Sequence, residues 1–84
     1  MALYLTRTFQ KNFERIPNKI RPQVKKSLKK LSKNPHCGKK LKGALDGEWS
    51  LRIGDYRIIY FCDEQENIWL ETIRHRKDVY KKTR

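Results

Sequence analysis

Arginine, histidine and tyrosine recur in the second half of the chain at spacings that could serve one reaction. Arg52 and Arg57 stand on either side of Gly54-Asp55, and the segment Arg74-His75-Arg76 is followed four residues later by Tyr80. Arginine neutralises charge on phosphate, histidine exchanges a proton near neutral pH, and tyrosine donates a hydrogen bond or stacks on a base. Together these groups would suffice for metal-independent RNA cleavage, in which the 2′-hydroxyl of the substrate attacks the adjacent phosphate.

The same side chains can also be interpreted as ordinary surface residues. Exposed arginines are common, and a histidine in a basic tail is usually solvated. The sequence offers no competing catalytic motif, since it has no glycine-rich phosphate loop, no nucleophile elbow and no carboxylate cluster suited to Mg²⁺. Glu48 and Glu71 could act as a base, but charged strand residues are more often solvated, and we leave both out of the candidate site.

The cysteines and histidines give no sign of a metal centre or a disulfide framework. The chain has two cysteines, Cys37 and Cys62, and no CxxC pair. Their spacing from His36 and His75 matches no zinc-ligand pattern. We therefore expect two reduced thiols, no metal and no cofactor.

A β-hairpin is the element that must position the first two arginines. From Glu48 onward apolar and polar residues alternate, and Gly54-Asp55 separates two such runs. If Gly54 and Asp55 are the two central turn residues, Arg52 lies directly opposite Arg57. The other face of the hairpin is then apolar and comprises Trp49, Leu51, Ile53, Tyr56, Ile58 and Tyr60. Like charges directly opposite each other destabilise a sheet, so a phosphate-binding site is the interpretation that explains the pair, with solvent-splayed arginines as the alternative.

A strand and two helices are expected before the hairpin. Residues 3–5 are β-prone, and Thr6 or Thr8 offers a helix N-cap before an apolar stripe with helical spacing. A proline interrupts this stripe, and a second amphipathic helix with lysines on its outer face begins between Lys19 and Pro22. The sequence therefore predicts a strand followed by two helices.

A third strand over residues 68–73 would complete an antiparallel meander, and the basic tail from Arg74 to Arg84 could form a short terminal helix. Helices followed by strands predict an α+β fold in the order β-α-α-β-β-β, with two N-terminal helices packed on one face of a small, mostly antiparallel sheet. The whole chain, residues 1–84, is expected to be a single domain. The other face of the sheet is then available for function.

Lysines add to the candidate site on both sides of the hairpin. Residues 33–43 contain several helix and strand breakers and predict an exposed, cationic loop. Candidate substrate-binding residues are Arg52, the loop residues Lys39, Lys40 and Lys42, and the tail residues Arg76, Lys77 and Lys81.

The net charge of the chain points to a polyanionic partner. Among 84 residues there are 21 Lys and Arg and 9 Asp and Glu, which leaves a formal charge of +12. So much like charge in a small globule favours binding to nucleic acid, but a ribosomal or DNA-binding protein would fit the charge equally well. No apolar run approaches the length of a membrane span or a signal-peptide core, so we expect a soluble, cytoplasmic protein without membrane contact.

The order of these motifs resembles the signature of RelE/ParE-type toxins. The residues that carry the resemblance are Leu41-x-Gly43, Gly47-x-Trp49-x-Leu51-Arg52-x-Gly54-Asp55-Tyr56-Arg57-x-x-Tyr60 and Ile73-x-His75-Arg76-x-x-x-Tyr80. The resemblance extends over essentially the whole chain and implies two helices packed on a twisted sheet. In this superfamily the RelE branch cleaves mRNA in the ribosomal A site, and the ParE branch inhibits DNA gyrase.

The resemblance also implies roles for individual residues. It assigns stabilisation of the scissile phosphate to Arg57, charge neutralisation and proton transfer to Arg74 or His75, and substrate positioning to Tyr80. Because all of these positions are filled, the RelE-like nuclease is preferred to the gyrase inhibitor. Some RelE relatives carry lysines on the strand before the turn, one of them a proposed base, where this chain has Glu48 and Ser50. The general base is therefore left open.

The resemblance implies a toxin of a type II toxin–antitoxin system that cleaves mRNA on the ribosome and is neutralised by a small antitoxin. The antitoxin's C-terminal segment is expected to present acidic and apolar residues, and operator DNA would be contacted through the antitoxin complex. Two alternatives remain open, a ParE-like gyrase inhibitor and a non-catalytic basic RNA-binding protein.

Overall fold

The computed structural model of the protein describes residues 2–41 and 47–75. Two helices and five strands follow one another along the chain in the order β1, α1, α2, β2, β3, β4, β5. Their bounds are β1 Leu3–Leu5, α1 Arg7–Arg15, α2 Arg21–Lys33, β2 Lys39–Lys40, β3 Glu48–Ile53, β4 Tyr56–Cys62 and β5 Ile68–His75. Neither helix in these residues is long and apolar enough to cross a membrane.

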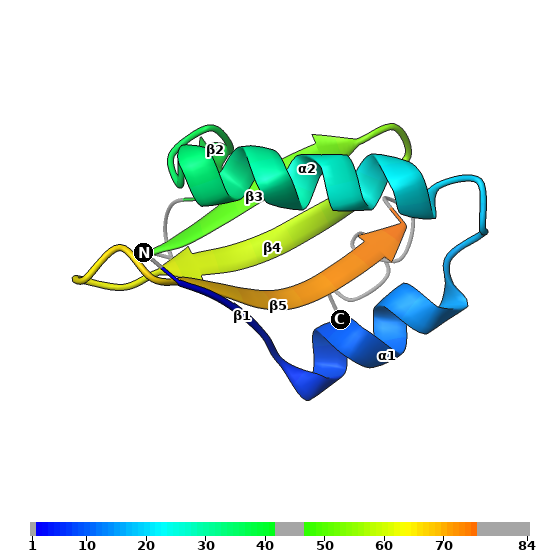
Figure 1. Cartoon of the computed structure of the whole chain (residues 1–84), viewed down its shortest axis with the longest axis horizontal. Coiled ribbons are helices and arrows are strands. Elements are labelled where there is room, and N and C mark those ends of the chain that lie inside the picture. The colour runs from blue at the N-terminus through cyan, green and yellow to red at the C-terminus, as the bar shows by residue number, and fades with distance from the viewer. Residues whose placement is uncertain (1, 42–46, 76–84) are drawn as a thin grey trace.

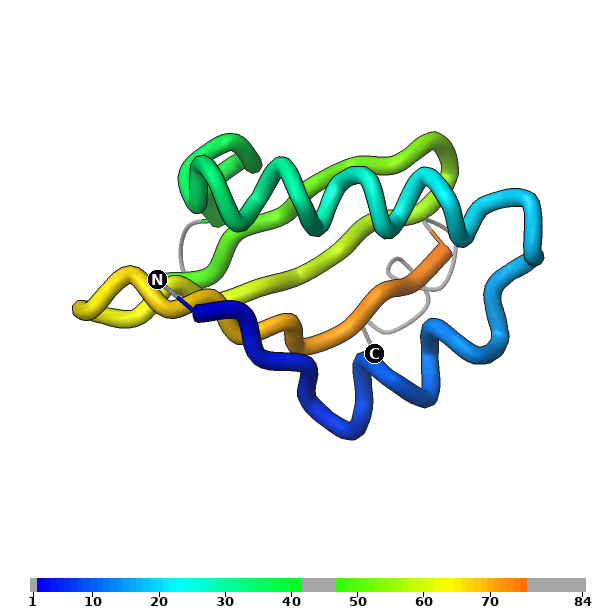
Figure 2. The backbone as a smooth tube through the Cα atoms, viewed as in Figure 1, coloured from blue at the N-terminus to red at the C-terminus, as the bar shows by residue number. Residues whose placement is uncertain are grey.

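The strands form one sheet in the order β1-β5-β4-β3-β2, and both helices lie on the same side of it (Figure 1). Only β1 and β5 run parallel, whereas every other neighbouring pair is antiparallel. Helix α1 packs mainly against β5, and α2 packs against β3. The tube in Figure 2 shows the N-terminal strand lying beside the start of β5. The α+β prediction, with two helices on one face of a mostly antiparallel sheet, is confirmed.

Threonine and proline define where the two helices begin. The Thr6 hydroxyl accepts a hydrogen bond from the Phe9 N–H at 3.2 Å, as an N-cap should, and donates to the Leu70 carbonyl at 2.8 Å. The cap therefore ties the start of α1 to β5. Pro22 occupies the first turn of α2, where its missing N–H costs nothing. Both helix starts agree with the positions that the sequence predicts.

The core lies between the helices and the sheet. Phe9 on α1 and Val24 and Leu31 on α2 are fully buried against apolar residues of the strands. The buried strand residues are Ile53, Ile58, Tyr60, Ile68, Leu70 and Ile73. Burial of this apolar surface is the main force that holds the helices to the sheet. The opposite side of the sheet, which neither α1 nor α2 covers, is called the open face below.

The hairpin has the predicted register. Arg52 pairs with Arg57, and Ile53 with Tyr56, on either side of the two-residue turn. Gly54 has φ +59°, a conformation that glycine adopts at little cost. The apolar residues of the hairpin face the helices, as the alternation requires.

The structure corrects the sequence prediction at two elements. Lys39–Lys40, expected in an exposed loop, forms the short strand β2 and pairs with β3. Strand β5, expected to end at Ile73, continues to His75, so Arg74 and His75 belong to the sheet and not to the tail. A bulge in β5 accompanies this extension: Ile59 pairs with Thr72 and Tyr60 with Leu70, which leaves Glu71 as the extra residue.

Candidate functional site

Three arginines lie side by side across the open face. Arg52 on β3 is directly opposite Arg57 on β4, and Arg57 is directly opposite Arg74 on β5. Neighbouring strands are about 4.8 Å apart, so the three side chains start from adjacent positions on one line across the sheet. We call Arg52, Arg57 and Arg74 the arginine row. The sequence predicted the first of its two cross-strand pairings, Arg52 with Arg57, whereas the second depends on the longer β5.

Hydrogen bonds from Nε hold the two outer arginines of the row. Arg52 Nε donates to the Gly54 carbonyl at 3.0 Å, which bends the side chain toward the hairpin turn. Arg74 Nε donates to the Thr72 hydroxyl at 3.2 Å. In the described part of the chain, the terminal guanidinium nitrogens of both arginines have no hydrogen-bond acceptor. These nitrogens are therefore available for bidentate hydrogen bonding to a phosphate.

A short hydrogen-bond chain connects Arg74 to helix α1. The Thr72 hydroxyl, which accepts from Arg74, donates to the side-chain oxygen of Asn12. The same oxygen accepts from the backbone N–H of Ile73 at 3.4 Å. Strand β1 pairs with β5 only as far as Leu70, and Asn12 takes its place as hydrogen-bond acceptor at Ile73. Asn12 also fixes the orientation of Thr72. No sequence pattern indicated this role for Asn12.

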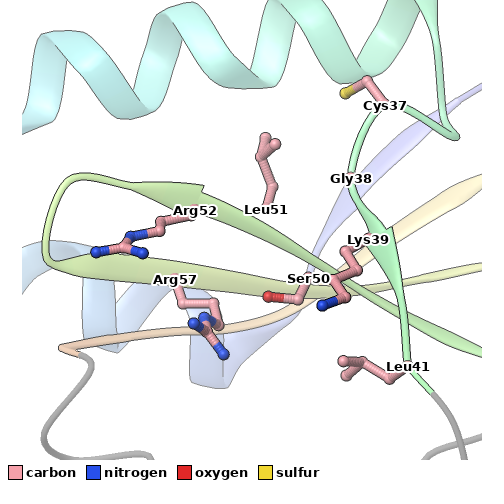
Figure 3. Close-up of a pocket in the computed structure, with 8 residues that line it drawn as sticks. All are labelled: Cys37, Gly38, Lys39, Leu41, Ser50, Leu51, Arg52 and Arg57. Atoms are coloured by element: carbon pink, nitrogen blue, oxygen red, sulfur yellow. The ribbon is translucent and has the colours of Figure 1, made fainter.

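A cavity of about 560 Å³ adjoins the arginine row. It is lined by Cys37, Gly38, Lys39, Leu41, Ser50, Leu51, Arg52 and Arg57. Figure 3 shows Arg52 and Arg57 extending from β3 and β4 and Lys39 approaching Ser50 from β2. Lys39 therefore lines the same cavity as Arg52 and Arg57, and its predicted role in substrate binding stays a prediction. Lys40, also predicted to bind substrate, does not line this cavity and pairs with Trp49 instead.

Tyr60 and Gly38 hold β2 against the edge of the sheet. The buried Tyr60 hydroxyl donates to the Pro35 carbonyl at 2.8 Å and accepts from the Gly38 N–H at 3.2 Å. A Cβ atom on Gly38 would lie 2.7 Å from both the Ser50 carbonyl oxygen and the Tyr60 hydroxyl, so only glycine fits. Burial raises the pKa of Tyr60 to about 12, and the phenol stays protonated at neutral pH. This contact places Lys39 beside Ser50.

His75 does not join the arginine row. It is opposite Tyr56, and the two rings meet edge to face with centroids 5.2 Å apart. Tyr56 packs against the core, so the alternation of β5 directs His75 to the helix side of the sheet and Arg74 to the open face. The predicted proton-transfer role of His75 stays a prediction. Of the other predicted residues, Lys42, Arg76, Lys77, Tyr80 and Lys81 lie outside the described residues.

Glu48 and Glu71 form a carboxyl pair that the sequence analysis did not include in the site. Glu71 is the extra residue of the β5 bulge and is hydrogen-bonded to Glu48 of β3. Burial, this hydrogen bond and the charge of Glu48 together raise the pKa of Glu71 to about 7. A carboxyl group that titrates near neutral pH can act as a general acid or base. The pairing was not visible in the sequence because it depends on the bulge.

The described residues contain no metal centre of the usual kind. Within residues 2–41 and 47–75, no three His, Cys, Asp or Glu side chains come together, and Cys37 and Cys62 are free thiols.

Two helices packed on one side of a small, mostly antiparallel sheet are the fold of solved RelE-type toxins. The sequence profile described as "ParE toxin of type II toxin-antitoxin system, parDE" matches residues 3–80. The chain belongs to this family and is a type II toxin of the RelE/ParE superfamily.

Two curated relatives come from Mycobacterium tuberculosis. Toxin RelG is 31% identical over 80 residues, which cover 92% of this chain and 92% of RelG. Toxin RelE is 39% identical over 62 residues, which cover 71% of this chain and 64% of RelE. The family resemblance stated from the motifs is thus confirmed.

Solved structures of similar fold include toxins bound to their antitoxins. The RelBE2 toxin–antitoxin complex of Mycobacterium tuberculosis matches with a TM-score of 0.80 and 27% identity, covering 88% of this chain and 95% of that one. The RelB–RelE complex from Methanococcus jannaschii matches with a TM-score of 0.81 at 24% identity, covering 96% and 99%. The isolated RelE toxin of E. coli has a TM-score of 0.78 at 20% identity, covering 95% and 90%, and shows the shared fold alone.

Proposed function

We propose that this toxin is a ribosome-dependent endoribonuclease that cleaves mRNA in the A site and so inhibits translation. The observation that carries the proposal is the arginine row. Three guanidinium groups on adjacent strands destabilise the sheet through like-charge repulsion, and a polyanion that lies across the strands removes that cost. The names of two relatives, toxin RelE and toxin RelG of Mycobacterium tuberculosis, agree with the nuclease branch of the superfamily.

The proposed reaction needs no protein nucleophile. The 2′-oxygen of the substrate attacks the adjacent phosphorus, the bond to the 5′-oxygen breaks, and the products are a 2′,3′-cyclic phosphate and a 5′-hydroxyl. Arg57, at the centre of the row, would neutralise the charge that develops on the scissile phosphate, with Arg52 and Arg74 holding the phosphates on either side. Tyr80 would position the substrate, and Lys39 would bind the RNA backbone.

Two groups compete for the role of general base. His75 carries an imidazole, the most common general base in enzymes, but faces the helix side of the sheet. The Glu48–Glu71 pair lies on the same face as the arginine row. A pH–rate profile of Glu71→Gln and His75→Gln separates them, since only replacement of the true base removes the titrating limb of the profile. The ribosome would align the 2′-hydroxyl for attack.

The partners follow from this function. A cognate antitoxin is supported by the solved complexes of related toxins with their antitoxins. The ribosome and mRNA are the proposed targets, which places the toxin in the cytoplasm, and operator DNA would be reached only through the antitoxin complex.

The deciding experiment is primer extension on a defined mRNA in a reconstituted translation reaction. We expect cuts at fixed positions within codons, absent without ribosomes and reduced at least a hundredfold by Arg57→Ala, because an electrostatic contact to the transition state is lost. Lys29→Ala, which removes the same charge from the exposed side of α2, is the matched control and should cleave normally. Equal activity of Arg57→Ala and wild type would refute the proposal.

A ParE-like gyrase inhibitor is the second candidate, because the matching family profile is described as ParE toxin. It predicts intact mRNA in the translation assay and loss of gyrase supercoiling. In that case the arginine row would be a binding surface and not a catalytic one.

A further inference from the structure

A second row of side chains crosses the open face at the other end of the strands. Phe61 on β4 is opposite Trp69 on β5, and Trp69 is opposite Tyr4 on β1. The three residues are 36%, 39% and 43% exposed, respectively, and the rings of Tyr4 and Trp69 stack with centroids 4.4 Å apart. We call Phe61, Trp69 and Tyr4 the aromatic row. Exposed aromatic residues that lie next to one another indicate a binding surface more often than isolated ones do.

Acidic groups surround the aromatic row. Glu48 lies in register with it on β3, and Glu71 is hydrogen-bonded to Glu48. The turn that joins β4 to β5 adds Asp63, Glu64 and Glu66, and Asp63 accepts a hydrogen bond from the Trp69 indole at 3.1 Å. Five of the nine acidic residues of the chain therefore gather at this end of the sheet. The open face is basic at the hairpin end and apolar and acidic at the other.

This distribution of charge argues against RNA at the aromatic row. Bases could stack on the rings, but their phosphates would lie among these acidic residues and be repelled by their net negative charge. A protein segment with both apolar and charged residues satisfies the whole surface.

We propose that the aromatic row is the anchoring site of the antitoxin, and that the antitoxin segment crossing the open face carries three kinds of residue in order. Acidic residues would lie over the arginine row, apolar residues over the aromatic row, and Lys or Arg over the turn at residues 63–66. The inference rests on the proposed antitoxin partner. It adds where on the toxin the antitoxin is anchored, and that the antitoxin carries basic residues next to its apolar ones.

The geometry also sets the spacing within the partner. Arg57 and Phe61 are four residues apart on β4, a separation of about 13 Å. The acidic and apolar groups of the antitoxin are therefore expected about four residues apart if its segment is extended, or about nine residues apart if it is helical.

The test measures antitoxin affinity independently of nuclease activity. The probe is the antitoxin purified from the natural complex, titrated against toxin variants that all carry Arg57→Ala. We expect Trp69→Ala to raise the dissociation constant at least tenfold, because truncated aromatic anchors are typical binding hot spots. Phe61→Thr, a substitution that suits a strand, should have an effect in the same direction. Leu5→Ala is the control. Leu5 is 44% exposed on β1, the edge strand that carries Tyr4, but its side chain alternates to the face opposite the aromatic row.

The inference would be overturned if Trp69→Ala and Phe61→Thr both fold and both bind the antitoxin with a dissociation constant within twofold of the Arg57→Ala parent. Tighter binding by Glu64→Lys/Glu66→Lys at low salt would overturn it too, because that would place acidic partner residues at the turn. If Trp69→Ala in the otherwise wild-type toxin abolishes mRNA cleavage, while the Trp69→Ala variant that carries Arg57→Ala binds the antitoxin normally, the aromatic row belongs to RNA and the inference is wrong. Absence of cleavage by the wild type would refute the proposed nuclease and leave the affinity result valid.

Discussion

At the scale of single residues, the arginine row is not explained by stability. Arg57 has a like charge on each neighbouring strand. Each such pair lowers the stability of the folded state by about 0.2–1 kcal/mol. Within the described residues the terminal nitrogens of Arg52 and Arg74 have no protein acceptor to offset that cost. The arrangement therefore supports the proposed anionic ligand, since folding gains nothing from it.

Glu71 predicts a measurable pH dependence of stability. Its pKa is about 7 in the folded protein and 4.5 for an ordinary glutamate, so the folded state binds the proton more tightly. The stabilisation that this proton gives is fully present below about pH 4.5 and is lost as the pH rises through 7. Between pH 5 and pH 8, urea unfolding should show a loss on the order of 1 kcal/mol, after allowance for solvent screening, that is absent in Glu71→Gln.

The comparison with Glu71→Gln isolates this group, because every other titrating residue is common to both proteins. Glu48→Gln supplies a second check, since it removes the neighbouring charge and should lower the pKa of Glu71. Parallel pH curves for wild type and Glu71→Gln would show that the two carboxyl groups do not share a proton.

At the scale of elements, β5 determines which residues meet. The bulge at Glu71 lets Leu70 and Ile73 both reach the core although they are three residues apart, and it sets Thr72 and Arg74 on the open face. Helix α1 then supports this half of the strand through Asn12. The arginine row is thus completed by a bulge, a strand edge and a helix together.

Thr72 is expected to position Arg74 in the reaction. Thr72→Val keeps the shape and β propensity but removes the hydroxyl that accepts from Arg74, so the guanidinium group loses its fixed direction. Single-turnover cleavage of ribosome-bound mRNA should fall roughly tenfold to a hundredfold, as expected for a misplaced catalytic group. Thr72→Ser, which keeps the hydroxyl, should restore most of the rate. A Val variant as active as wild type would show that Arg74 needs no such support.

Local chemistry decides which elements could be predicted from the sequence. The hairpin register follows from Gly54-Asp55, because a two-residue turn fixes every pair on both strands. The start of α1 follows from the cap at Thr6. These features depend on residues that are close together in the chain.

The missed features depend on residues far apart in the chain. Strand β2 has only two residues, and it is held by Tyr60 through contacts to Pro35 and Gly38, more than twenty residues away. The Glu48–Glu71 pair and the link from Asn12 to Thr72 likewise join distant segments. In the candidate site, the pair Arg52 and Arg57 was therefore predictable, whereas the Arg57–Arg74 contact and the orientation of His75 were not.

At the scale of the whole molecule, the distribution of charge matters more than its total. The net charge of +12 suggests that RNA could bind anywhere. Among residues 2–41 and 47–75, however, the open face is basic at the hairpin end and acidic around the aromatic row. Long-range attraction would draw RNA to the molecule from all directions, and the acidic end would direct its phosphates toward the arginine row.

Salt dependence separates the local charge from the total charge. Arg57→Ala and Lys29→Ala change the net charge equally, but only Arg57 lies in the arginine row. Each phosphate contact to single-stranded RNA contributes about −0.7 to the slope of log K against log salt concentration. With a 2′-O-methylated oligonucleotide, which cannot be cleaved, Arg57→Ala should make the slope shallower by roughly that amount and Lys29→Ala should leave it unchanged. Equal changes in both variants would mean that RNA responds to the net charge alone, and that the three arginines form no defined phosphate site.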